Sequence, residues 1–151
     1  NRRTTLNPQP STRKVIILGC GRVGAELARL LDRDGHDVTI IDPDVEAFRR
    51  LAPGFKGTIM AGDGLDQEVL RQAGVDIADA FISLMDGDNH NIMASQIAKH
   101  VHRVPTVISQ IKDPLRGEAY DALGIESVSP TILGADKIRE VMGTKGPRPA
   151  P

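Results

Sequence analysis

The chain has 151 residues, of which 40% are hydrophobic and 26% are charged, a balance typical of one soluble globular domain with a single core. Its net charge of −1 and its 3% of aromatic residues argue against nucleic-acid binding, which needs basic patches and stacking side chains. No apolar run approaches the roughly 18 residues of a membrane helix, so we expect no direct membrane insertion. A single cysteine, Cys20, excludes an internal disulfide and any site with several cysteine ligands.

The two ends differ in composition from the middle. Residues 1–12 are polar and contain two prolines, and residues 144–151 contain three prolines and two cations. Because neither segment can bury enough apolar area to order itself, we expect a disordered leader or linker at 1–12 and a disordered tail at 144–151. The folded domain is then residues 13–143. It is acidic, since the ends carry four cations and no acid.

Between the ends the hydrophobic pattern alternates between strand and helix. Short runs rich in β-branched residues predict six buried strands, at Val15–Leu18, Val38–Ile41, Thr58–Ala61, Ala80–Leu84, Thr106–Ile108 and Ser127–Val128. Amphipathic helical patterns lie between them, one of which is Val23, Leu27, Leu30 and Leu31. Such alternation predicts an α/β fold with a doubly wound, Rossmann-like parallel sheet of strand order 3-2-1-4-5-6 in a single domain.

A glycine pattern follows the first predicted strand and opens the first predicted helix. It reads Gly19-Cys20-Gly21-Arg22-Val23-Gly24. In this context Gly19 allows a tight turn, Gly21 lets backbone approach a pyrophosphate, and Gly24 lets helix and strand pack closely. The alternative is a strand-to-helix turn that uses glycine for geometry alone. Cys20 at a helix start raises the further alternative of a reactive thiol, although a small residue is the simpler explanation.

An acid at the end of the second predicted strand favours nucleotide binding. Asp42 lies 18 residues beyond Gly24, followed by Pro43. A carboxylate there accepts hydrogen bonds from the hydroxyls of an adenosine ribose and repels a 2′-phosphate. The alternative is a turn residue, and Asp44 is a candidate cap for the next helix. Together with the glycine pattern, Asp42 predicts binding of an adenine nucleotide, either NAD or NADH, or ATP, ADP or AMP.

Lys14 to Met142 resembles the regulator of potassium conductance (RCK or KTN) N-terminal domain, also called the TrkA N-terminal domain. The motifs that carry the resemblance lie in chain order at 19–24, 41–44, 61–66, 69–80, 88–91, 113–114 and 124–130. The resemblance implies that backbone of Gly19, Gly21, Arg22, Val23 and Gly24 holds phosphates and that Asp42 holds the ribose. It also implies that Asp63 and Gly64 lie beside the adenine, while Ser83 and Leu84 line the crevice between the first and fourth strands.

The same resemblance implies a regulatory function without catalysis. Members of this family form homodimers or higher rings at the cytoplasmic, inner face of the membrane, where nucleotides change the ring shape and gate a potassium channel or transporter. Arg22 would contact phosphates across a dimer interface, and the helix at 132–142 would either cross to a partner or cover its own sheet. Gln110 stands where many members have arginine, and the chain stops where many continue into a second ligand-binding domain, so neither that contact nor that site is expected here.

Other functions have weaker support in the sequence. A cofactor-binding domain of an NAD-dependent oxidoreductase is the alternative, but such enzymes need a substrate pocket with a proton donor, for which we see no room. We therefore expect no catalytic residue. We also expect no metal site: Asp86, Asp88 and Asn91 suggest a cation, yet a helix cap is the simpler interpretation.

Overall fold

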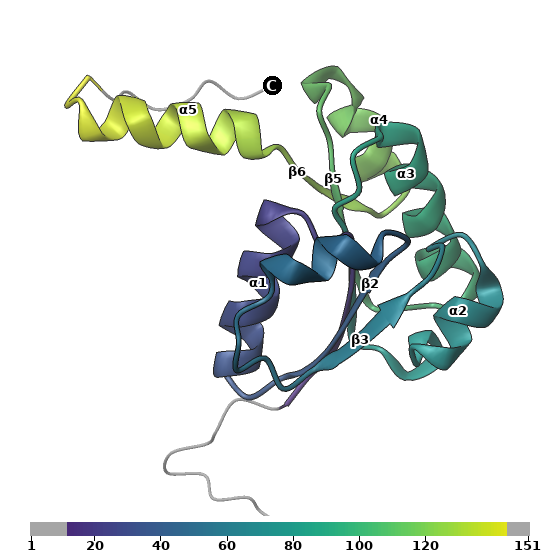
Figure 1. The fold of residues 1–151 in the computed structure, drawn as a ribbon. Helices are drawn as coiled ribbons and strands as arrows, with labels where there is room; N and C mark the ends of the chain where they lie inside the picture. The colour runs from purple at the N-terminus through teal and green to yellow at the C-terminus, as the bar shows by residue number, and fades with distance from the viewer. Residues whose placement is uncertain (1–11, 145–151) are drawn as a thin grey trace, which may run out of the picture.

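The computed structural model describes residues 12–144, which form a six-stranded sheet with helices on both faces (Figure 1). The strands are β1 (Lys14–Leu18), β2 (Asp37–Asp42), β3 (Thr58–Ala61), β4 (Ala80–Ser83), β5 (Thr106–Gln110) and β6 (Glu126–Val128). All five pairings are parallel, and the order is β3-β2-β1-β4-β5-β6. The predicted fold class and strand order are confirmed. The predictions for residues 1–11 and 145–151 lie outside the described residues.

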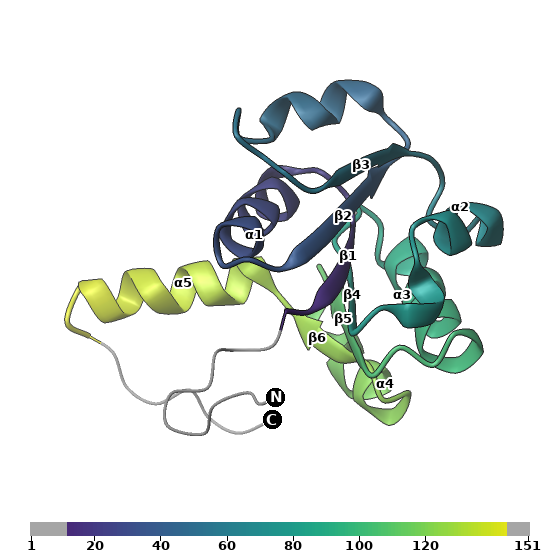
Figure 2. The same ribbon diagram turned by 90° about the horizontal axis from the view of Figure 1, so that it is seen from below.

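The helices divide between the two faces of the sheet (Figures 1 and 2). The α-helices are α1 (Arg22–Arg33), α2 (Gln67–Gln72), α3 (Asp88–Gln96), α4 (Gly117–Ala122) and α5 (Pro130–Val141). Short 3₁₀ segments are η1 (Val45–Arg50), η2 (Val75–Ile77) and η4 (Pro114–Arg116), and η3 (Ile97–Val101) is a π-helical continuation of α3. No helix among the described residues is long and apolar enough to cross a membrane.

Successive side chains of β1 point to opposite faces of the sheet and so belong to two separate hydrophobic cores. Ile16 and Leu18 point to the face covered by α2, α3 and α4. Val15 and Ile17 point to the opposite face, where they pack with α1 and η1. Because both faces are covered, the central strands are mostly apolar, which explains their nearly continuous hydrophobic runs in the sequence.

The last helix stands apart from this arrangement. Helix α5 extends from the end of β6 on the α1 side of the sheet (Figures 1 and 2), and none of its residues is buried. Of the two alternatives for this helix, that it covers its own sheet is therefore wrong, and that it crosses to a partner stays a prediction. Beside α1, the sheet instead has an apolar groove of about 450 Å³, whose walls include Val15, Leu27, Leu31, Ile82 and Ile108.

Candidate functional site

Two of the three glycines in the turn after β1 are required by packing. Gly19 has a φ of +109°, and a Cβ atom there would lie 2.8 Å from the carbonyl oxygen of Leu84. A Cβ atom on Gly24 would lie 1.9 Å from the carbonyl oxygen of Gly19. Gly19 therefore lets the turn meet the end of β4, and Gly24 lets α1 pack on the turn. Neither glycine by itself indicates a ligand.

Gly21 differs because nothing in the described structure requires a glycine there. Its φ of −80° is accessible to any residue, and a Cβ atom would meet nothing within 4 Å. Gly21 is also the N-cap of α1, where no side chain caps the helix and the first turn contains no acid. The unpaired N–H groups of a helix start attract anions, and open space before a glycine lets an anion approach the backbone.

Asp42 ties the end of β2 to this turn. The residue is 8% exposed, and its Oδ2 accepts the backbone N–H of Cys20 at 2.8 Å. Its Oδ1 accepts the backbone N–H of Asp44 at 2.9 Å. Each carboxylate oxygen keeps a second lone pair, so Asp42 braces the turn and can also accept a ribose hydroxyl. Asp44 caps η1 by accepting the N–H of Glu46 at 3.0 Å, which confirms its predicted role.

Cys20 is a packing residue of the turn. Its side chain is buried in the core shared by α1 and η1. Burial raises the pKa of the thiol, the Asp42 carboxylate raises it further, and the Arg50 guanidinium acts in the opposite direction. The net effect is a raised pKa, opposite to the lowering that a helix start suggests. A reactive thiol is not supported.

The turn after β3 brings Asp63 to the same edge of the sheet. Asp63 accepts the backbone N–H of Leu65 at 2.9 Å and lies 3.5 Å from Nε2 of His90 on α3. Gly64 is buried, and a Cβ atom there would lie 2.3 Å from the Leu18 side chain, so packing requires this glycine. Sequence reasoning missed His90, because it lies 27 residues beyond Asp63 and no spacing rule connects them.

The end of β4 differs from the expectation for Ser83. Its hydroxyl is fully buried and donates to Oδ1 of Asn91 at 2.7 Å, so it braces the interior instead of facing the crevice. The buried Asn91 also accepts the N–H of Met85 at 2.8 Å and donates to the carbonyls of Met85 and Gln110. Gln110 donates from Nε2 to the Met85 carbonyl at 3.4 Å. These bonds hold β4, α3 and β5 together beside the turn.

Two further expected residues face away from the turn. Leu84 and Val23 both line the apolar groove beside α1. Val23 belongs to the uncapped first turn of α1, whereas the backbone N–H of Leu84 already donates to the Leu18 carbonyl at 2.7 Å.

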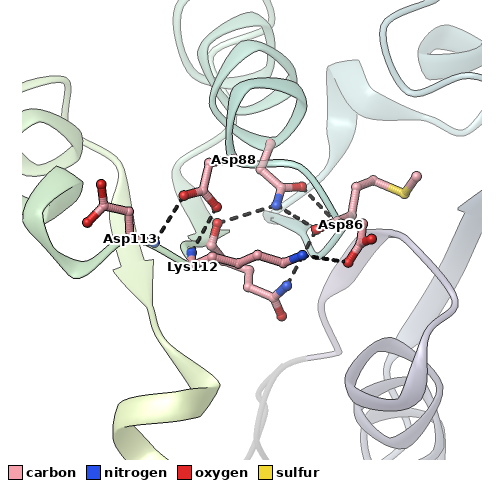
Figure 3. A network of polar contacts seen from close by, with 7 residues as sticks. Asp86, Asp88, Lys112 and Asp113 are labelled. Atoms are coloured by element: carbon pink, nitrogen blue, oxygen red, sulfur yellow. Dashed lines mark hydrogen bonds and ion pairs between the residues drawn. The ribbon is translucent and has the colours of Figure 1, made fainter.

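The acids after β4 are held by a polar network with the segment after β5 (Figure 3). Oδ1 and Oδ2 of Asp88 accept the backbone N–H groups of Lys112 at 2.8 Å and Asp113 at 3.1 Å. Lys112 Nζ contacts Asp86 Oδ1 at 2.9 Å. The N-cap of α3 is Gly87, so the helix-cap interpretation of Asp88 is wrong. Within residues 12–144 no group of three metal-ligating side chains comes together.

The parallel sheet gathers these segments at one edge. Leu18, the last residue of β1, pairs with Ile41 of β2 and Ser83 of β4, so the segments after all three strands are neighbours. A parallel sheet of order 3-2-1-4-5-6, with a glycine turn after its first strand and a carboxylate ending its second, defines the class of Rossmann-like domains. The chain belongs to the TrkA-N domain family, whose model matches residues 15–130.

Relatives and solved structures agree with this family. The Trk system potassium uptake protein TrkA of Streptomyces coelicolor is 42% identical over 135 residues, which cover 89% of this chain and 60% of the relative. The crystal structure of the GsuK RCK domain superposes with a TM-score of 0.73 at 25% identity, covering 89% of this chain and 29% of that one. The GsuK channel bound to NAD superposes with a TM-score of 0.74 at 25% identity, covering 89% and 24%. The chain thus spans about 60% of the length of its TrkA relative.

Proposed function

We propose that the carboxyl edge of the sheet binds an adenine nucleotide, either NAD or NADH, or ATP, ADP or AMP. The observation that carries the proposal is Gly21, a glycine with open space before it, at the uncapped start of α1. Phosphates would face the backbone of Gly21, Arg22 and Val23, and the ribose would bind Asp42. The NAD-bound GsuK channel, similar over 89% of this chain, supports this assignment.

The nucleotide acts as a signal in this proposal and is not consumed. The similarity to a Trk system potassium uptake protein supports a regulatory domain of a membrane-embedded potassium channel or transporter, at the cytoplasmic face of the cell membrane. A ligand shifts such a regulator between two shapes only through its differential affinity for them. A coupling of about 1–3 kcal/mol is the usual scale for such regulation.

Two surfaces support a homodimer, from which a higher ring can be built. Helix α5 exposes Leu133, Ile138 and Val141, whose relative exposures are 59%, 64% and 75%. The apolar groove beside α1 has a volume of about 450 Å³, and no helix within residues 12–144 covers it. We propose that α5 of one subunit lies in the apolar groove of its partner, because burying both surfaces together removes their apolar area from water.

Calorimetric titration with ATP, ADP, AMP, NAD and NADH tests the nucleotide proposal. We expect saturable binding of at least one of them, with a change in the mass or the small-angle scattering of the assembly. Absence of binding to all five would contradict the proposal. Consumption of NADH with a small carbonyl substrate would instead favour an oxidoreductase.

The variant Asp42→Ala tests the position of the ribose. Loss of the charged hydrogen bond is expected to weaken every adenosine ligand by about 1–3 kcal/mol. Asp44→Ala removes a neighbouring carboxylate that caps η1 and is the matched control. Equal affinity in Asp42→Ala and wild type would remove the ribose assignment.

A further inference from the structure

A second groove, rich in arginine, lies on the face of α1 that points away from the apolar groove. This arginine groove, about 500 Å³ in volume, is lined by Arg22, Ala25, Glu26 and Arg29 of α1 and by Arg50 and Ala52. Glu26 is occupied by Arg29, whose Nε donates to its Oε1 at 3.0 Å. Arg22 and Arg50 form no ion pair within residues 12–144. The arginine groove therefore carries two uncompensated guanidinium groups.

Arg22 and Arg50 differ from the arginines that a neighbouring acid neutralises. Half of the arginines in residues 12–144 pair with an acid three residues away, as Arg49 does with Glu46 at 3.0 Å and Arg71 with Glu68 at 3.8 Å. Arg50 follows Arg49 directly but points into the groove instead. Unpaired arginines gathered in one concave site favour a phosphate, which a guanidinium fork binds through two parallel hydrogen bonds.

Hydrogen bonds place Arg50 at the ribose end of the nucleotide site. Its Nη1 donates to the carbonyl oxygen of Cys20 at 3.3 Å, while the N–H of Cys20 donates to Asp42 at 2.8 Å. The Arg50 guanidinium thus binds the carbonyl of Cys20 and the Asp42 carboxylate binds its N–H. Both charges also act on the pKa of the Cys20 thiol, which Asp42 raises and Arg50 lowers. A ribose bound to Asp42 would have its 2′ and 3′ oxygens beside Cys20, within reach of the remaining N–H donors of Arg50.

The two positive charges of Arg22 and Arg50 exceed the single negative charge of Asp42. A carboxylate at this position repels a 2′-phosphate when its charge is uncompensated. Here each oxygen of Asp42 accepts a backbone N–H, and the Arg50 guanidinium brings a positive charge to the same turn through its hydrogen bond to the Cys20 carbonyl. We propose that the arginine groove is a subsite for a phosphate on the 2′ or 3′ oxygen of the bound adenosine. The subsite rests on the proposed nucleotide function and adds a ligand class to it, the adenosine bisphosphates and their dinucleotides.

Calorimetry with AMP, adenosine 2′,5′-bisphosphate and adenosine 3′,5′-bisphosphate tests the subsite. We expect at least one bisphosphate to bind about tenfold more tightly than AMP, and the preferred isomer identifies the oxygen concerned. Arg50→Gln keeps a polar side chain at this position but loses the charge, so the ratio of the two dissociation constants should fall to about one. Arg49→Gln, whose arginine pairs with Glu46, is the control that keeps the ratio.

The outcomes separate this inference from the proposed function. If wild-type protein binds AMP at least as tightly as both bisphosphates, the subsite is wrong while the nucleotide site stands. If the domain binds neither these ligands nor NAD nor ATP, the proposed function itself fails. A wild-type preference for a bisphosphate that survives in Arg50→Gln overturns the assignment to Arg50.

Discussion

Substitutions at Gly21 and Gly24 distinguish a glycine proposed to bind phosphates from a glycine that packing requires. A Cβ atom at Gly21 meets open space, whereas one at Gly24 meets the Gly19 carbonyl oxygen at 1.9 Å. We expect Gly21→Ala to change the free energy of unfolding by less than about 1 kcal/mol, because its φ suits alanine. Nucleotide affinity should fall by about tenfold or more, because the methyl group occupies the space where phosphates approach.

Gly24→Ala is the matched comparison. It should lower the free energy of unfolding by about 3 kcal/mol, because the backbone of the turn must move. Urea unfolding and calorimetry of both variants make the check. Equal affinity of Gly21→Ala and wild type for every nucleotide would remove the phosphate site from this turn.

Among the elements, β4, α3 and β5 are joined by one buried side chain, Asn91. It exchanges hydrogen bonds with Ser83, with both backbone groups of Met85 and with the Gln110 carbonyl. Asn91→Ala should lower the free energy of unfolding by about 2–4 kcal/mol, since several buried polar groups lose their partner. Asn89→Ala, on the exposed side of the same helix, should cost less than about 1 kcal/mol. Urea unfolding that ranks the two variants equally would contradict this role of Asn91.

Helix α5 gives a second prediction at this scale. The double variant Leu133→Asp and Ile138→Asp should be monomeric, because charged side chains cannot enter an apolar groove. The subunit itself should remain folded, since no residue of α5 is buried within its own chain. Light scattering after size exclusion measures the mass, and Thr131→Asp on the same helix is the control. A double variant with the mass of wild type would place the dimer contact elsewhere.

For the whole molecule, two buried groups make the free energy of unfolding depend on pH in the alkaline range. The pKa of Cys20 is raised mainly by burial and secondly by the charge of Asp42. The pKa of Tyr120 is raised mainly by burial and secondly by the charge of Asp88. The unfolded chain therefore loses these protons first, at about pH 8.5 for the thiol and about pH 10 for the phenol. Their contribution to stability is complete below that range and falls as pH rises through it.

Urea unfolding at pH 8 and pH 10.5 measures this decline. Tyr120→Phe keeps the buried ring but has no phenol to ionise, so its stability should fall less steeply between the two pH values. A decline as steep in Tyr120→Phe as in wild type would exclude a contribution from the phenol.

Much of the fold follows from the sequence alone. The period of hydrophobic residues identified the strands to within a few residues, because strands buried on both faces are mostly apolar. Alternation with helices determined a parallel sheet, and parallel strands bring their carboxyl ends to one edge. The glycine turn and Asp42 could therefore be placed together from the sequence, since each is adjacent to the end of a strand.

Tertiary structure alone decided which atoms at that edge remain available. The burial of Ser83 against Asn91, the approach of His90 to Asp63 and the reach of Arg50 to Cys20 all join residues from different elements. The exposed position of α5 likewise depends on where β6 ends and on what the sheet leaves uncovered. Periodicity reports the environment of a residue along its own strand or helix. It carries no information on distances of a few ångströms between side chains that the fold brings together.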